Sequence, residues 1–354
     1  MIKQTVRSEP VVEHVIDLDL PPSQRLAKII EIERDAAREL FDGVMAQFED
    51  FPSLLIPVLA WLYRIFDGPY KRELKEWADA LGLSFSKTVL VNCAYELEHF
   101  DEIIPKPFGC TTGLCPFGGN AMAHVRSLDW PIPVMAKATR LLRYQKGKHQ
   151  FVSVGFPMFV GVLSGMVPGA YSVTINWAPP VGLPNFHHGP SFLLRKVLED
   201  CLTYDSAVAR LSRSRLSTSV FFTVCGKSTR EGCIIERTKN KAIIRQISSD
   251  CEAQSNHHVA SEFVGNNQAP EESDDLLIRT TRERREKMLA KLGSISRASN
   301  DLSALFDLLS DEPVTNEQTI QRMVLCPARG ELHFDRRLKA SKTEMEWGRS
   351  VWKV

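Results

Sequence analysis

The sequence predicts an α+β protein, in which helical stretches and β-strands occupy separate parts of the chain. Residues 1–109 show mostly helical periodicity, whereas short segments rich in Val, Ile, Phe and Thr follow from Cys110 onward. No regular alternation of strand, helix and strand runs through the chain. We therefore expect a helical N-terminal portion, residues 1–109, followed by a layered domain of strands and helices over residues 110–354.

In the N-terminal portion, a short strand is expected before a series of helices. Apolar and polar residues alternate from Val11 to Leu20, which is typical of a half-buried strand. Helices are expected over residues 25–48, 51–66, 70–81 and 87–98, the first after Pro21-Pro22-Ser23 and the last capped by Ser84 or Ser86. The segment from Ile103 to Gly109 holds two prolines, so we expect an exposed linker there.

The segment of residues 51–66, FPSLLIPVLAWLYRIF, is apolar almost all round. It is shorter than the ~20 apolar residues that span a bilayer. The simpler interpretation is a buried helix. The alternative is a helix that touches a membrane surface or a lipid substrate, because an apolar surface of this size usually has a use.

From Cys110 onward, seven strands and three helices are expected. The strands cover residues 121–129, 138–144, 150–156, 171–177, 219–225, 232–237 and 241–247. The helices cover residues 191–211, 275–292 and 302–309. Residues 265–275 are polar and acidic, so a mobile loop is expected between two of these elements.

Composition excludes several classes of function. Hydrophobic residues make up 44% and charged residues 25% of the 354, as in ordinary soluble globular proteins. The 44 basic and 43 acidic residues nearly cancel, so no nucleic-acid partner is expected. The first residues, Met1-Ile2-Lys3-Gln4-Thr5, lead into no apolar stretch, which predicts a cytoplasmic protein without a secretory signal.

No cofactor or metal is expected. The eight cysteines form no CxxC pattern and no His/Cys group has zinc spacing, so free thiols in a reducing compartment are the default. His187-His188 and His257-His258 are paired histidines. Such pairs rarely bind a metal without further ligands at a fixed spacing.

The pair Gly109-Cys110 gives the first indication of chemistry. A free cysteine has a pKa of ~8.5 and is mostly protonated at neutral pH, so a catalytic thiol needs a base. An N-terminal cysteine carries its own base, an α-amine with a pKa of about 7.7–8.0. Cys110 becomes N-terminal only if the Gly109–Cys110 bond is cut. Taken alone, however, such a pair more often marks a structural, buried cysteine.

Further motifs change this interpretation. They are Asp17-Leu18-Asp19-Leu20-Pro21-Pro22, Leu90-Val91-Asn92-Cys93-Ala94-Tyr95-Glu96, Cys110-Thr111-Thr112, Arg126-Ser127-Leu128-Asp129, Ser255-Asn256, and Leu302 to Val314 followed by Thr319-Ile320. With these motifs the chain resembles the choloylglycine hydrolase superfamily of N-terminal nucleophile (Ntn) hydrolases, in its N-acylethanolamine acid amidase and acid ceramidase branch. The resemblance spans nearly the whole chain and implies an αββα four-layer sandwich.

The resemblance also implies roles for individual residues. Cys110 would be the nucleophile, Arg126 would favour the thiolate, and Asp129 would orient the new α-amine. A surface salt bridge is the alternative for Arg126 and Asp129. Asn256 aligns with an oxyanion-hole asparagine, whose loss typically costs ~2.7–4 kcal/mol of transition-state stabilisation.

The resemblance implies two further site residues, each with an alternative interpretation. Asn176 matches a second oxyanion contact of bile-salt hydrolases, although an asparagine that ends a strand is also a common turn residue. Arg282 falls where the family places a late arginine. It belongs to the crowded run Arg279, Arg282, Arg284 and Arg285, and such a run is usually a solvated helix face.

The resemblance therefore implies a self-activated thiol amidase. It would cut its own chain before Cys110, keep the two fragments associated, and hydrolyse a fatty-acyl or ceramide-like amide through an acyl-thioester. An acyltransferase or a penicillin or bile-salt acylase of the same fold is one alternative. An uncleaved, non-catalytic lipid-binding protein is the other.

Overall fold

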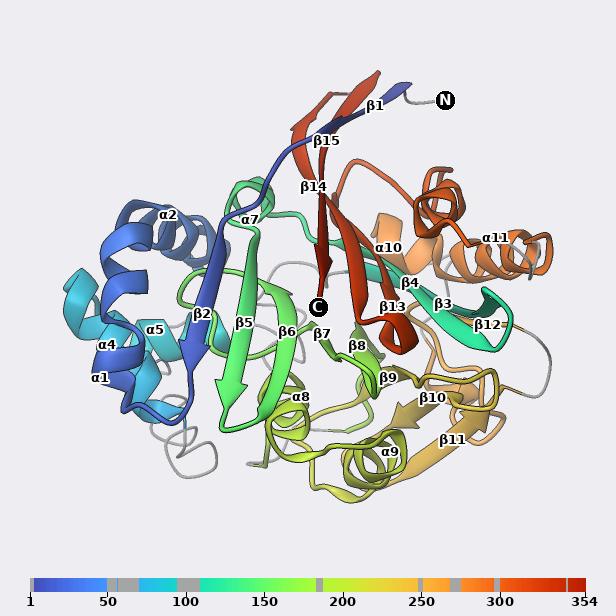
Figure 1. Ribbon diagram of the computed structural model, residues 1–354, viewed down its shortest axis with the longest axis horizontal. Coiled ribbons are helices and arrows are strands. Elements are labelled where there is room, and N and C mark those ends of the chain that lie inside the picture. The colour runs from blue at the N-terminus through green and yellow to red at the C-terminus, as the bar shows by residue number, and fades with distance from the viewer. Residues whose placement is uncertain are drawn as a thin grey trace.

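The computed structural model describes residues 3–49, 56, 70–93, 109–182, 187–247, 251–267, 275–295, 300–341 and 343–354. Two β-sheets lie face to face, and helices cover their outer faces (Figure 1). The prediction of an α+β, four-layer sandwich is confirmed by this arrangement. The predicted division of the chain at 109/110 stays a prediction.

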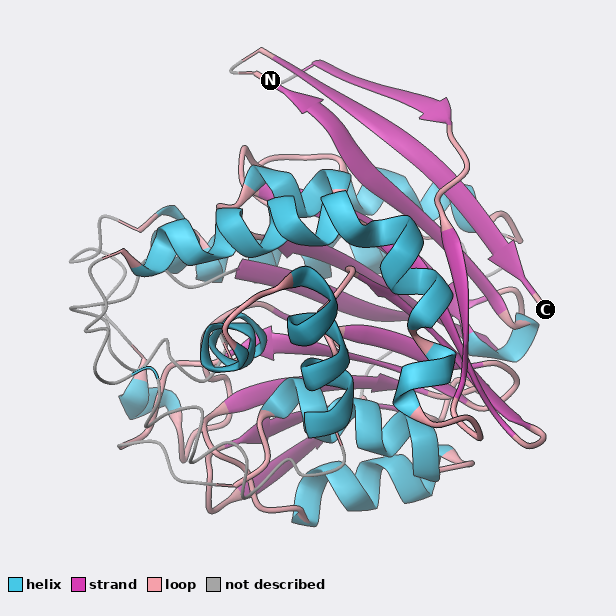
Figure 2. Ribbon diagram, turned by 90° about the vertical axis from the view of Figure 1, so that its left-hand side faces the viewer, coloured by secondary structure: helices cyan, strands magenta, loops and turns pink. Residues whose placement is uncertain are grey.

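The first sheet has seven strands, and its edge is formed by the two ends of the chain. Its order is β1 (Lys3–Ser8), β15 (Glu344–Lys353), β14 (Glu331–Ala340), β13 (Thr319–Cys326), β4 (Ala121–Asp129), β3 (Gly109–Phe117) and β12 (Glu252–Gln254). Only the β1–β15 pair is parallel among these neighbours. Strands β1, β14 and β15 extend beyond the helical layers (Figure 2).

The second sheet has eight strands and packs on the first through β8 against β3. Its order is β11 (Ala242–Gln246), β10 (Gly232–Arg237), β9 (Val220–Cys225), β8 (Tyr171–Trp177), β7 (Ser164–Val167), β6 (His149–Gly155), β5 (Arg140–Lys146) and β2 (Glu13–Asp17). Every residue of β3 and of β8 is buried, because each strand has a sheet on one face and helices on the other.

Different helices cover the two outer faces. The eight-stranded sheet contacts α8 (Pro190–Asp200) and α9 (Tyr204–Arg213). The seven-stranded sheet contacts α11 (Thr281–Gly293), which follows the short α10 (Leu276–Arg279), and the 3₁₀ helix η4 (Leu302–Leu309). Amphipathic faces of these helices complete the hydrophobic layers outside each sheet.

The N-terminal portion is helical as predicted, but it also contributes a strand to each sheet. Its helices are α1 (Pro22–Arg25), α2 (Ala27–Met45), the 3₁₀ turn η1 (Ala46–Phe48), α4 (Lys71–Leu81) and α5 (Phe85–Asn92). Strand β2 lies inside the expected strand of residues 11–20, whereas β1 was not predicted. A further helix, α7 (Pro133–Lys137), and the 3₁₀ turns η2 (Val264–Asn266) and η5 (Pro327–Arg329) complete the described helical elements.

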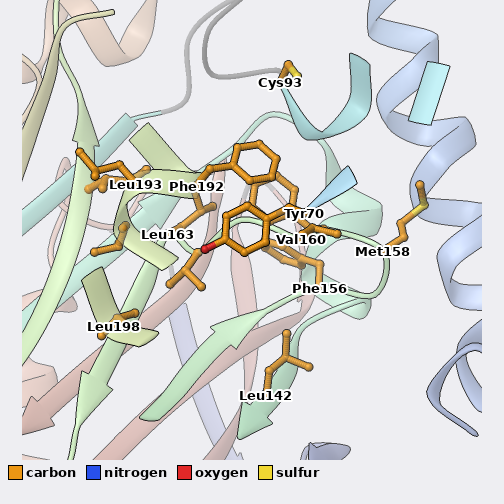
Figure 3. Close-up of a cluster of buried hydrophobic side chains, with 14 of the residues drawn as sticks. Tyr70, Cys93, Leu142, Phe156, Met158, Val160, Leu163, Phe192, Leu193 and Leu198 are labelled. Carbon is orange, nitrogen blue, oxygen red and sulfur yellow. The ribbon is translucent and has the colours of Figure 1, made fainter. Parts of the chain in front are cut away.

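The N-terminal portion shares its core with the rest of the chain. Tyr70 and Cys93 belong to the same buried cluster as Phe192 and Leu163, and Figure 3 shows Tyr70 beside Phe192. Tyr70 and Phe192 lie with ring centroids 5.6 Å apart. These contacts bury apolar surface that neither part covers by itself.

Two predicted helices are interrupted. The expected helix of residues 191–211 ends at Asp200, and α9 begins after Thr203, whose hydroxyl forms a capping box with Ser206. A capping box fixes a helix start and so separates the two segments. The expected helix of residues 275–292 is also divided, at Thr280, which makes no side-chain cap to the second segment.

Several predictions concern residues outside the described ones. They are the apolar segment 51–66 apart from Ile56, the end of the helix predicted to reach residue 98, the linker before Gly109, and most of the loop of residues 265–275. Among the helices that are described, none is long and apolar enough to cross a bilayer.

Candidate active site

Cys110 lies in the middle layers of the sandwich, on β3, with no exposed surface. Its backbone pairs with Leu128 of β4, and the preceding Gly109 pairs with Asp129. The antiparallel register therefore places the 109/110 peptide bond beside the end of β4. Arg126 of the same strand donates a hydrogen bond from Nη2 to Cys110 Sγ at 3.2 Å.

The Arg126 guanidinium is held rigidly by groups of the opposite sheet. It donates to the carbonyl oxygens of Leu163 and Ile175 and to the Ser164 hydroxyl, and its side chain is fully buried. Burial raises the pKa of the Cys110 thiol, and the neighbouring Arg126 charge lowers it without reversing the effect. Cys110 is therefore a protonated thiol that lies beside a buried guanidinium group.

Asp129 ends β4 and is also fully buried. Thr319 donates a 2.6 Å hydrogen bond to its Oδ1, and its Oδ2 lies 4.0 Å from Arg284 Nη1. Burial raises the pKa of this carboxyl group, while the Arg284 charge acts in the opposite direction. The position beside Gly109 agrees with the predicted role of holding an amine at Cys110, which stays a prediction.

Asn256 follows β12 and contacts Cys110 directly. Its Oδ1 accepts a hydrogen bond of 3.0 Å from the Cys110 backbone nitrogen and one of 2.9 Å from Arg284 Nη2. Its Nδ2 donates to the carbonyl oxygen of Trp177 at 2.9 Å. Because an amide nitrogen carries two hydrogens, one remains for a further acceptor such as the oxyanion that the resemblance implies.

In the arginine run, Arg284 is the residue that hydrogen-bonds to Cys110, whereas the role assigned to Arg282 stays a prediction. Arg284 is fully buried and donates to the Cys110 carbonyl oxygen at 2.7 Å and to Thr111 Oγ1 at 3.0 Å, whereas Arg282 is exposed. Burial lowers the pKa of Arg284, and the Asp129 charge counteracts this.

A signal for Arg284 was present in the sequence. Met288 and Leu292 are apolar, and steps of four residues back from Leu292 lead to Met288 and then to Arg284 on the same helical face. The crowded arginine run hid this periodicity. Thr281, a further buried residue of that face, was also missed.

Asn176 is buried on β8, and its Nδ2 donates to the carbonyl oxygens of Gln254 and Ser255, at 3.1 and 3.2 Å. It therefore supports the backbone just before Asn256. A direct role for Asn176 in an oxyanion hole stays a prediction.

Gly109 itself is packed tightly. A Cβ atom at this position would lie 2.7 Å from Leu277 Cδ2, so a side chain there would force the buried Leu277 to move. Within the described part of the chain, no group of three or more His, Cys, Asp or Glu side chains is placed to hold a metal ion.

Comparison with known proteins identifies relatives along most of the chain, although no family model matches. The N-acylethanolamine-hydrolyzing acid amidase of Caenorhabditis elegans is 28% identical over 330 residues, covering 88% of each chain. The acid ceramidase of Heterocephalus glaber is 24% identical over 347 residues, covering 88% of this chain and 82% of its own. The chain is a homologue of these enzymes.

The predicted kinship with the amidase and ceramidase branch is thereby confirmed. A solved structure of the Caenorhabditis elegans amidase orthologue has a TM-score of 0.49 and 24% sequence identity to the chain described here. The match covers 62% of this chain and 93% of the orthologue.

Proposed function

We propose that this chain is a cysteine Ntn amidohydrolase that cuts its own Gly109–Cys110 bond and then hydrolyses N-acyl amides, of the fatty-acyl or ceramide-like kind. One observation carries the proposal. The thiol, the backbone nitrogen and the backbone carbonyl of Cys110 are each hydrogen-bonded by a different buried polar side chain, those of Arg126, Asn256 and Arg284.

The prediction of an enzyme that acts on linear amide bonds is confirmed by the homologues. These are named as an N-acylethanolamine-hydrolyzing acid amidase and as acid ceramidases. The thiol nucleophile, the self-cleavage and the acyl group of the substrate belong to the proposal.

Self-cleavage would begin with Cys110 Sγ adding to the carbonyl carbon of Gly109. The C–N bond then breaks, the nitrogen takes the thiol proton, and residues 1–109 are joined to the sulfur as a thioester. Water hydrolyses this thioester to release the Gly109 carboxylate and restore the thiol. Asn256 Oδ1, which holds the peptide nitrogen at 3.0 Å in the uncut chain, would retain the new α-amine.

Catalysis would use the same groups. The α-amine takes the thiol proton, Arg126 stabilises the thiolate, and the sulfur adds to the substrate carbonyl. The leaving amine receives the proton, an acyl-thioester remains, and water releases the fatty acid. Buried, fixed donors such as Arg126 suit this chemistry because they need no reorganisation when charge develops.

The remaining predictions belong to this proposal. The N-terminal fragment would stay bound after the cut, supported by its strands in both sheets and by the shared core. A cytoplasmic location and contact of residues 51–66 with a membrane surface are further parts of it.

Intact-mass analysis of the purified chain beside Cys110→Ala tests the cut. We expect two fragments that separate at 109/110 in the wild type and one uncut chain in the variant. The cut protein is then assayed with N-acylethanolamines, ceramide, bile-salt conjugates and penicillin V, each with and without an added amine acceptor.

Release of a fatty acid from the first two substrates supports the proposal, whereas transfer to the added amine indicates an acyltransferase. A single uncut wild-type chain that forms no acyl adduct with an amide probe would refute self-activation and favour a lipid-binding protein.

A further inference from the structure

A cluster of polar side chains contacts the backbone of Asn256, whose side chain contacts Cys110. Its centre is Thr281, the first residue of α11, whose side chain is buried. Thr281 Oγ1 accepts a 2.8 Å hydrogen bond from the Asn256 backbone nitrogen. It also lies 2.9 Å from Ser255 Oγ and 3.1 Å from His257 Nδ1.

The protons of this cluster can be assigned. A hydroxyl group has one hydrogen and two acceptor positions. The Ser255 hydroxyl donates to the Thr281 carbonyl oxygen at 2.6 Å, so the proton of Thr281 is directed to Ser255 Oγ or to His257 Nδ1. The lone pairs of Thr281 Oγ1 can then accept the hydrogen bond from the backbone N–H of Asn256. Without this hydroxyl group, the buried N–H would lose this acceptor.

The same helix face also holds the other end of Asn256. Arg284 lies three residues after Thr281, hence on the same side of α11, and donates to Asn256 Oδ1 at 2.9 Å. Thr281 thus fixes the Asn256 backbone and Arg284 fixes its side chain. Between these two contacts, Asn256 Oδ1 reaches the Cys110 nitrogen.

We propose that Thr281 is a positioning residue, which acts through Asn256 to keep its amide in line with the nitrogen of Cys110. The inference rests on the proposed function, because it matters only if that nitrogen becomes the α-amine of the enzyme. Small displacements of such a group are expensive, since a misplacement of about 1 Å can lower a rate by about 100-fold.

The test compares Thr281→Val, which keeps the shape but removes the hydroxyl, with Thr281→Ser, which keeps the hydroxyl. Thr88→Val is the matched control, because Thr88 is also buried and its hydroxyl donates to a backbone carbonyl, that of Ser84. Each full-length variant is assayed with a fluorogenic fatty-acyl anilide. Rates are divided by the fraction cut at 109/110, measured by intact mass, and folding is followed by circular dichroism.

We expect kcat of Thr281→Val to fall by about 10- to 100-fold with KM within twofold of the wild type. Thr281→Ser should recover most of kcat, and Thr88→Val should keep it. If Thr281→Val does not fold, Thr281→Ala replaces it, since the smaller side chain cannot overpack.

A Thr281→Val or Thr281→Ala enzyme with wild-type kcat, or a serine variant as slow as the valine variant, would overturn the inference alone. A wild type that neither cuts nor turns over the anilide overturns the proposed function and the inference with it.

Discussion

Arg284 donates a 2.7 Å hydrogen bond from Nη1 to the backbone carbonyl oxygen of Cys110, across 174 positions of sequence. The guanidinium is fully buried, so its five N–H donors must find acceptors within the protein. It finds them at Thr280, Cys110, Thr111, Asn256 and Leu277, the last at 2.7 Å. One side chain therefore ties the predicted nucleophile to the asparagine that contacts it.

Replacement of Arg284 is expected to disable the site, whereas replacement of its exposed neighbour is not. Arg284→Lys keeps the charge but cannot bridge Cys110 and Asn256 at once, because an ammonium group lacks the forked geometry. We expect at least a 100-fold loss of kcat/KM for Arg284→Lys and less than a twofold change for Arg282→Lys. Equal losses in the two variants would support Arg282 as a site residue.

A side chain at Gly109 is expected to slow self-cleavage. The Cβ atom of Gly109→Ala would lie 2.7 Å from Leu277 Cδ2, and overpacking of this kind typically costs about 1–3 kcal/mol. The double variant Gly109→Ala/Leu277→Ala should recover part of the rate, because the space for the methyl group is then free. Time courses of intact mass measure the cut. Additive effects of the two substitutions would show that Leu277 is not the cause.

The negative charge of Glu33 is expected to stabilise the folded protein at neutral pH, and this stabilisation is expected to be lost in acid. Burial alone would raise the pKa of this carboxyl group, but hydrogen bonds from His14 at 2.6 Å and from Arg140 at 2.7 Å lower it from 4.5 to about 2. The folded-state pKa is lower than the unfolded one, so this stabilisation is complete above about pH 4.5 and is lost as the pH falls towards 2. The difference corresponds to about 3 kcal/mol at neutral pH.

Glu33→Gln should therefore be less stable than the wild type at pH 7 and approach it near pH 2. Urea unfolding at several pH values measures this. Glu13→Gln serves as the control, because Glu13 forms an exposed ion pair with Arg143 that contributes at most about 1 kcal/mol. A Glu33→Gln variant with an unchanged pH dependence would contradict the prediction.

The ion pair between Glu73 and Arg195 is expected to hold the N-terminal fragment after cleavage. Arg195 donates two hydrogen bonds to the Glu73 carboxylate, at 2.6 and 2.7 Å, and both side chains are buried. Breaking a buried pair of this kind typically costs about 3–5 kcal/mol. Arg195→Met should therefore release residues 1–109 at a lower urea concentration than the cut wild type in size-exclusion chromatography.

Lys75→Met provides the comparison for this experiment, since the Lys75–Asp79 pair is exposed and lies entirely within the N-terminal fragment. Its fragments should separate at the wild-type urea concentration. Co-elution of both fragments from Arg195→Met at every concentration that releases the wild type would contradict a role for the pair.

Strands with strong apolar patterns could be predicted from the sequence to the residue. Strands β4, β8 and β10 have the predicted bounds, and each contains the β-branched residues Val, Ile or Thr that favour strands. Strand β3 could not be predicted in this way, since it contains two glycines and Pro116, which are disfavoured in strands. Its small residues are explained by packing: a Cβ at Gly113 would lie 2.7 Å from Leu292 Cδ1. The strand conformation of β3 therefore depends on tertiary contacts and not on local strand propensity.

The site shows the same division. Cys110, Arg126 and Asp129 lie close together in sequence, so two neighbouring strands bring them together and a local motif reveals them. Asn256 and Arg284 come from a distant loop and helix, and their geometry depends on how α11 packs on β3 and β12. A sequence pattern carries such long-range packing only weakly, so the contact of Arg284 with Cys110 was not predicted.

The pairing of β1 with β15 has a consequence for the order of events during synthesis. Residues 3–8 align with residues 344–349, so the edge of the seven-stranded sheet closes only after nearly the whole chain has left the ribosome. The contacts of Cys110 with Asn256 and Arg284 likewise require residues far downstream. The proposed self-cleavage would therefore be a post-translational event, and a nascent chain that stalls before residue 284 should remain whole.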